Sequence, residues 1–135
     1  MPPRYFTVDE VNQLIPQLEA LLPQLREARR QLIEQERALG RVVSERVETN
    51  GFHMDRETQA GQLKGVADDT MNDFRRLVQE VTDLGAEVKD PEQGLVDFRG
   101  LREGREVLLC WRLGEPECAW WHDLDTGFGG RQPLD

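Results

Sequence analysis

The residues that could do chemistry gather in the last quarter of the chain. His122 and both cysteines, Cys110 and Cys118, lie there together with all three tryptophans. Charged side chains that could assist them lie in or near the same stretch: Asp97, Glu115, Asp125 and Arg131. Catalysis or ligand binding is therefore expected in this quarter.

A metal site would need three or four of these side chains to converge. Its candidates are His122, Asp97 and Cys110, and the sheet register decides whether they meet. If Cys110 pairs with Trp121, Cys110 and His122 point to opposite sides of the sheet; if Cys110 pairs with His122, they are neighbours. Since no CxxC pair is present and buried cysteines usually pack as small apolar groups, we expect no metal ion and no cofactor.

Acid–base catalysis is the second possibility, because an imidazole exchanges protons near neutral pH. His122 would be oriented by Asp97 or Asp125. No serine or threonine lies in a nucleophile-elbow setting, and Cys110, inside a predicted strand, lacks the surroundings that produce a thiolate. The sequence therefore favours a structural hydrogen bond for His122 over catalysis.

The glycine-rich tail from Asp123 to Arg131 is the third candidate. Its glycines permit tight turns, and the planar guanidinium of Arg131, with Glu115 as a further candidate contact, could bind a carboxylate or phosphate. We favour a structural role in which Arg131 pairs with Asp123 or Asp125 and holds the tail.

Two helices precede this region. Thr7 and Glu10 form a capping-box pattern that predicts a helix from about Val8, and apolar residues then recur every seven positions: Val11, Leu18, Leu25, Leu32 and Leu39. Residues 49–51 are typical of a turn, and a second apolar seam runs to Gly85. The pattern predicts a long antiparallel helical hairpin.

After the loop around Pro91 the apolar period changes to two. Strands are expected at Leu95–Arg99, Arg105–Leu113 and Cys118–Leu124, with a short fourth strand at Glu87–Val88 as an option. The fold is thus predicted as α+β, a helical hairpin over residues 5–85 followed by a three- to four-stranded antiparallel meander and tail over residues 86–135. Together they are expected to form one domain over residues 1–135.

The first helix is longer than the second, which covers it only from about Leu21 onward. An apolar segment near its start then needs another partner, either the sheet region or a second copy of the chain: Val11, Leu14, Ile15 and Leu18. These four residues are the candidate dimer interface.

Composition excludes several functional classes. The net charge of −9 is spread along the chain, so nucleic-acid binding is not expected. No stretch approaches the roughly 18 apolar residues of a spanning helix and no signal-peptide pattern is present, which predicts a cytoplasmic protein without membrane contact.

Several of these segments also carry a family resemblance. Tyr5–Thr7 before the long helix, Gly94–Phe98, Leu109–Glu115 and Trp121–Asp123 with the following Gly127–Phe128 and Arg131–Pro133 resemble the bacterial family called domain of unknown function 2203. The resemblance implies a bacterial cytoplasmic protein of one domain, and it carries no activity, substrate or catalytic residue.

Two functions are compatible with these observations. The leading hypothesis is a non-catalytic interaction or assembly module that forms a homodimer through its long helices. The alternative is a small-molecule or metal-binding domain, a hydrolase being one form of it, with a site around His122 and Arg131.

Overall fold

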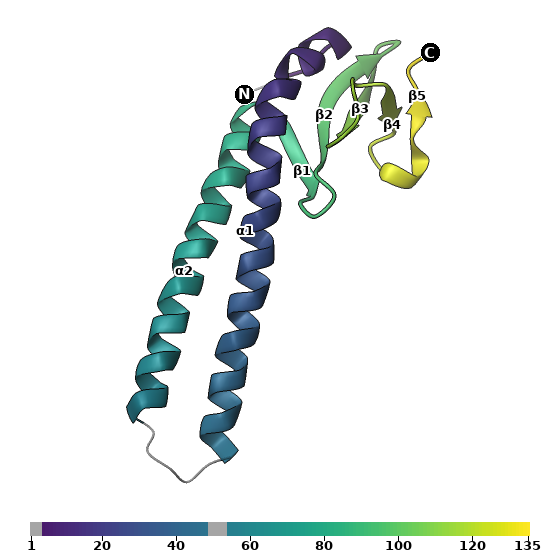
Figure 1. The fold of residues 1–135 in the computed structure, drawn as a ribbon. Helices are drawn as coiled ribbons and strands as arrows, with labels where there is room; N and C mark the ends of the chain where they lie inside the picture. Colours follow the sequence, from purple (N-terminus) through teal and green to yellow (C-terminus); the bar gives the residue numbers. More distant parts are fainter. Residues whose placement is uncertain (1–3, 49–53) are drawn as a thin grey trace. The chain divides into compact units, whose positions relative to one another are not determined.

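The computed structural model describes residues 4–48 and 54–135 of the chain and consists of two helices followed by a five-stranded antiparallel sheet (Figure 1). The elements are α1 (Val8–Glu48), α2 (Met54–Asp83), β1 (Ala86–Asp90), β2 (Leu95–Arg102), β3 (Arg105–Arg112), β4 (Trp120–His122), a short 3-10 turn (Phe128–Gly130) and β5 (Gln132–Pro133). The predicted α+β class with a helical hairpin and a meander is confirmed. The turn predicted at residues 49–51 lies outside the described residues.

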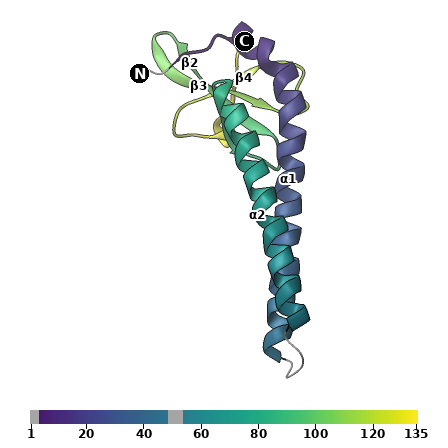
Figure 2. The ribbon, with the colours of Figure 1, turned by 90° about the vertical axis from the view of Figure 1, so that its left-hand side faces the viewer.

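Helix α1 begins at the predicted capping box. The amide of Thr7 donates to Glu10 Oε1 at 2.9 Å, and the amide of Glu10 donates to Thr7 Oγ1 at 3.1 Å. Both amides would otherwise lack a partner within the helix. The segment before the helix passes beside β2, where the amide of Phe6 donates to the carbonyl of Arg99 at 2.7 Å (Figure 2).

The chain divides into two compact units. One contains Met1–Arg26 and Leu77–Asp135, and the other contains Glu27–Arg76. In the second unit α1 and α2 lie side by side and bury Ala28, Val42, Ala67 and Thr70. The first unit holds the start of α1, the end of α2 and the whole sheet.

The start of α1 is part of the core of the first unit. Val11 and Leu18 are fully buried and Ile15 is 7% exposed, while Leu14 remains half-buried. Asn12 Oδ1 accepts a hydrogen bond from the amide of Cys118 at 2.7 Å, which ties this helix to the segment before β4. The expected interface through Val11, Leu14, Ile15 and Leu18 is therefore corrected: the chain's own first unit encloses most of this segment, so it offers no free apolar face.

The buried side of α1 also differs in detail from the predicted seam. Ile15 and Leu22 are buried although they lie outside the predicted seam, whereas Leu32 and Leu39 of that seam are only half-buried. A straight α-helix has 3.6 residues per turn, whereas a seven-residue repeat corresponds to 3.5 residues per turn. The buried face of the helix therefore moves gradually away from a strict seven-residue repeat.

The sheet has the strand order β1-β2-β3-β4-β5, with every neighbouring pair antiparallel. Strands β2 and β3 are joined by a two-residue turn in which Glu103 has φ 53° and Gly104 has φ 77°. Such paired positive φ values match the right-handed twist of a hairpin. The optional strand at Glu87–Val88 is present as part of β1, and β5 is an additional strand that the sequence pattern did not indicate.

Candidate functional site

Three adjacent strands bring Asp97, Cys110 and His122 together. Asp97 on β2 pairs with Cys110 on β3, while Cys110 pairs with Trp120 and Leu108 with His122 on β4. Because alternate residues of a strand share a face, all three side chains lie on one side of the sheet.

This register is neither of the two considered from the sequence. Cys110 faces Trp120, not Trp121 or His122, because the connection between β3 and β4 is longer than expected. Glu115 organises that connection: its side chain accepts from the amide of Arg112 at 2.6 Å, and its carbonyl accepts from the Trp111 indole at 3.1 Å. A shift of one residue from the first register thus places Cys110 and His122 on the same face.

The cluster is closely spaced and buried. Asp97 and His122 are each 2% exposed, Cys110 is fully buried, and one potential ligand atom from each residue lies within 4.8 Å of the other two. Within the described part of the chain this is the one group of three such side chains with metal-binding geometry.

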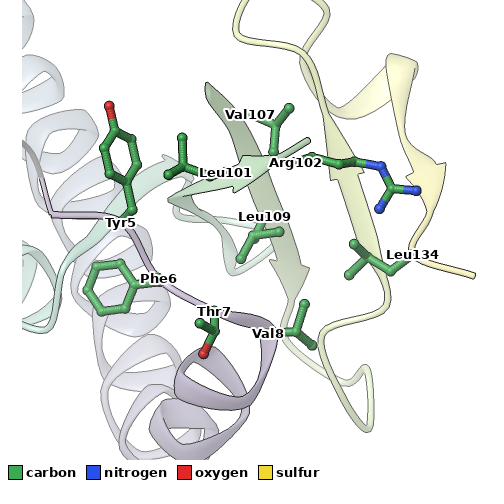
Figure 3. A pocket seen from close by; sticks show the side chains of 9 residues that line it. All are labelled: Tyr5, Phe6, Thr7, Val8, Leu101, Arg102, Val107, Leu109 and Leu134. Carbon is green, nitrogen blue, oxygen red and sulfur yellow. The ribbon is translucent and has the colours of Figure 1, made fainter. Parts of the chain in front are cut away.

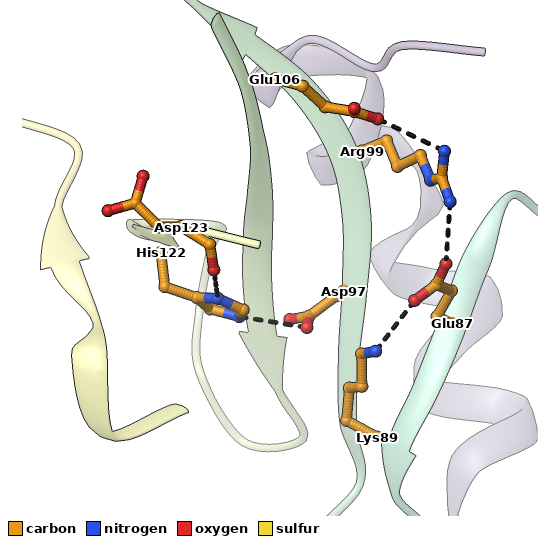
Figure 4. Close-up of polar contacts among 7 residues, drawn as sticks. All are labelled: Glu87, Lys89, Asp97, Arg99, Glu106, His122 and Asp123. Carbon is orange, nitrogen blue, oxygen red and sulfur yellow. Dashed lines mark hydrogen bonds and ion pairs between the residues drawn. The ribbon is translucent and has the colours of Figure 1, made fainter. Parts of the chain in front are cut away.

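Hydrogen bonds determine the tautomer of His122 (Figure 4). Its Nδ1 lies 2.7 Å from the carbonyl oxygen of Asp123, and its Nε2 lies 3.0 Å from Asp97 Oδ2. A carbonyl oxygen can only accept, so Nδ1 must carry a proton. In a neutral imidazole the lone pair of Nε2 then faces a carboxylate oxygen, and two acceptors meet.

Asp97 has a second unsatisfied requirement. Its Oδ1 is buried and has no hydrogen-bond partner among the described residues. A buried carboxylate oxygen without a donor is costly, and such positions are often occupied by a cation or a water molecule.

Cys110 is not placed to act as a nucleophile. Burial raises the pKa of its thiol to about 12, although Arg131, whose Nε donates to Cys110 Sγ at 3.3 Å, acts in the opposite direction. The thiol is therefore protonated at neutral pH unless a cation binds it. The other cysteine, Cys118, is also buried and lies outside the cluster.

Arg131 and Glu115 form the border of the cluster. The guanidinium donates to both carboxylate oxygens of Glu115, at 2.9 and 2.6 Å. The pairing expected with Asp123 or Asp125 is wrong, since Asp123 pairs with Arg105 at 2.7 Å and Asp125 is exposed. The two candidate ligand-binding residues instead satisfy each other.

A comparison with known proteins adds the family. The family model described as "Uncharacterized conserved protein (DUF2203)" matches residues 4–134. The chain belongs to this family. No curated protein and no solved structure matches it.

In this DUF2203 protein most of the predicted site residues converge. Asp97, Cys110 and His122 form the cluster, and Arg131 joins it through the cysteine sulfur. Asp125 does not take part. Sequence reasoning missed two contributions, the carbonyl of Asp123 and the rings of Trp120 and Phe128 beside Arg131, because neither a backbone contact nor a stacking partner follows from residue type.

A cavity of 320 Å³ lies elsewhere in the first unit of the DUF2203 chain (Figure 3). Tyr5, Leu101 and Leu134 are among its lining residues, and Val107 and Leu109 line it from β3. Since Val107 and Leu109 alternate with Leu108 and Cys110, the cavity lies on the opposite face of the sheet from the cluster. It offers no route to Cys110 or His122.

No helix among the described residues is sufficiently long and apolar to cross a membrane.

Proposed function

We propose that this protein binds one divalent metal ion of the zinc class through Asp97, Cys110 and His122. The observation that carries the proposal is the 3.0 Å approach of His122 Nε2 to Asp97 Oδ2 in a buried setting beside a cysteine sulfur, which brings two acceptors together when the imidazole is neutral. A cation among these atoms would satisfy all three.

The ligand chemistry supports an ion of this class. Imidazole nitrogen, carboxylate oxygen and thiolate sulfur are all ligands of Zn²⁺, and the two anionic ligands would balance its charge. Ligand atoms around tetrahedral zinc lie about 3.3–3.8 Å apart, given its bond lengths. The cluster, within 4.8 Å, needs side-chain movements of roughly 1 Å to reach that spacing.

The orientation of His122 supports the same proposal. Metal-bound histidines usually donate their second ring N–H to a carbonyl or carboxylate, as His122 Nδ1 is placed to do toward Asp123. The competing explanation is a buried ion pair between an imidazolium and Asp97. In that arrangement the Cys110 thiol would keep its proton and donate only a weak S–H hydrogen bond to Asp97, and Asp97 Oδ1 would gain no N–H or O–H donor.

The proposal concerns binding and assigns no reaction. The three cavities described in the first unit are lined by residues other than Asp97, Cys110 and His122. A buried ion linking β2, β3 and β4 would act chiefly on stability, since it bridges three strands distant in sequence.

Titration with Co²⁺, a spectroscopic substitute for Zn²⁺, tests the proposal. Protein freed of metal with a chelator should bind one equivalent and develop a thiolate-to-cobalt charge-transfer band. Cys110→Ser should remove the band and most of the affinity. Cys118→Ser, which changes the other buried cysteine, should retain both.

Circular dichroism of each variant establishes that it is folded. Absence of binding by the folded wild-type protein would reject the metal site. Equal loss in Cys110→Ser and Cys118→Ser would show that the cluster is not the binding site.

Self-association is the second candidate function, and the second unit favours it. Val43 and Val66 are 41% and 49% exposed, and several further apolar side chains there are only half-buried: Leu32, Ile33, Leu39, Leu63 and Phe74. A two-helix hairpin buries one side of each helix, so these residues suit contact with a second copy of the same hairpin.

A further inference from the structure

Arg131 has a defined orientation beside Cys110. Its guanidinium is clamped by two hydrogen bonds to Glu115, and its centre lies 4.5 Å from the ring of Phe128 and 5.4 Å from the ring of Trp120. Its side chain is 12% exposed and that of Glu115 is 18% exposed. A long side chain held in this way loses little further freedom when it makes another contact.

The remaining contact is with sulfur. Arg131 Nε donates to Cys110 Sγ at 3.3 Å, within reach of a sulfur hydrogen bond. A neutral thiol is a weak acceptor, whereas a metal-bound thiolate carries negative charge and accepts strongly. The same contact would therefore be strengthened by metal binding.

The segment after β4 contributes to the cluster twice. The carbonyl of Asp123 accepts from His122 at its beginning, and Arg131 donates to Cys110 at its end. Glu115, in the connection between β3 and β4, holds that end in place. Two of the three proposed ligands are thus oriented by one segment.

We infer, on the basis of the proposed metal site, that Arg131 is a positioning residue that stabilises the metal-bound thiolate of Cys110 through its Nε–H. Glu115 holds the guanidinium in the orientation required. Arg131 does not contact the metal, so its loss should weaken binding without changing the one-to-one stoichiometry.

The test compares Arg131→Met with Arg112→Met. Arg112 stacks on the same Phe128 ring, with its guanidinium 5.7 Å from the ring centre, but the hydrogen bond to Cys110 Sγ described in the structure comes from Arg131. Arg131→Met should bind Co²⁺ or Zn²⁺ with roughly 10–100-fold lower affinity than wild type. Competition with a chelator measures this difference. Arg112→Met should behave as wild type.

The cobalt spectrum distinguishes this role from a purely structural one, because the charge-transfer band would keep its energy if Arg131 only supported the fold. Loss of an N–H···S bond makes the thiolate a better electron donor, so the charge-transfer band should shift to lower energy in Arg131→Met. Glu115→Gln, which loosens the guanidinium without touching the sulfur, should produce a smaller shift in the same direction.

The outcomes separate the two proposals. If wild type binds no metal, the proposed function fails. If wild type binds and Arg131→Met retains the wild-type band and affinity, the metal site stands and the role of Arg131 is rejected. If Arg131→Met alone fails to fold, an unshifted band in folded Glu115→Gln likewise rejects it.

Discussion

At the scale of single residues, the cluster combines groups that are individually costly to bury. Asp97 has an oxygen without a donor, and the Cys110 thiol is desolvated. An isolated buried carboxylate opposes folding unless an opposite charge or hydrogen bonds compensate it. This cost of burial gives a physical reason to expect a cation. The cation would lie where the side chains of Asp97 and Cys110 meet on the sheet.

Glu115 should make stability depend on pH. Burial alone would raise its pKa, but hydrogen bonds from Arg131 and from the backbone of Arg112 outweigh burial and lower the pKa below its usual value. The unfolded chain therefore takes up the proton at higher pH than the folded protein does. Stabilisation by the charged carboxylate is complete above the unfolded pKa of about 4.3 and is lost as pH falls through the lower folded value.

Urea denaturation of wild type and Glu115→Gln measures this effect. At pH 7 the variant should be less stable by roughly 1–3 kcal/mol, as expected for loss of charge-assisted hydrogen bonds. The difference should shrink as the pH approaches 3. A difference that stays constant from pH 7 to pH 3 would contradict the assigned role of the carboxylate.

At the scale of elements, the start of α1 acts as part of the sheet's core. Leu18 is fully buried and Leu14 is half-buried, so two leucines four residues apart should respond differently to truncation. Leu18→Ala should cost about 2–5 kcal/mol of unfolding free energy, and Leu14→Ala less than about 2 kcal/mol.

Chemical denaturation at two protein concentrations checks this prediction. The wild-type stability could rise with protein concentration and be lost equally in Leu14→Ala and Leu18→Ala. That result would support a dimer interface through this segment. Unequal losses, independent of concentration, would support a core role.

The helical pattern predicted the existence and start of α1 but not which leucines are buried. Heptad spacing points to a side of the helix, and Ile15 and Leu22 lie at the margin of that side together with Leu14 and Leu21. Which of these residues is buried depends on where the sheet packs against the helix. The spacing of residues along one helix gives no information about that position.

At the scale of the whole molecule, the two units suggest separate tasks. The first unit holds the candidate metal site, whereas apolar exposure in the second unit favours self-association. We expect the mass of two chains in solution by light scattering at micromolar concentration. Val66→Glu should reduce the mass toward one chain, because a charge at a 49% exposed apolar position would be buried in the contact.

Leu101→Glu is the matched control, since Leu101 is 55% exposed but lies in the first unit. It should leave the mass unchanged. A wild-type protein that remains one chain at all concentrations would eliminate self-association.

The sequence by itself determined the two helices, the order of the main strands and the capping of α1, because these depend on contacts between residues near one another in the chain, whereas β5 became apparent only in the structure. The sequence also named Asp97, Cys110 and His122 as the candidate ligands of a metal site, although it favoured the absence of a metal ion. Only the tertiary structure decided that they meet. Strands of period two can pair in several registers of similar local energy, and a shift of one residue turns every side chain to the other face. The connection organised by Glu115 selects the register that places Cys110 and His122 together, and the packing of the first unit decides that Leu18 is core and not interface.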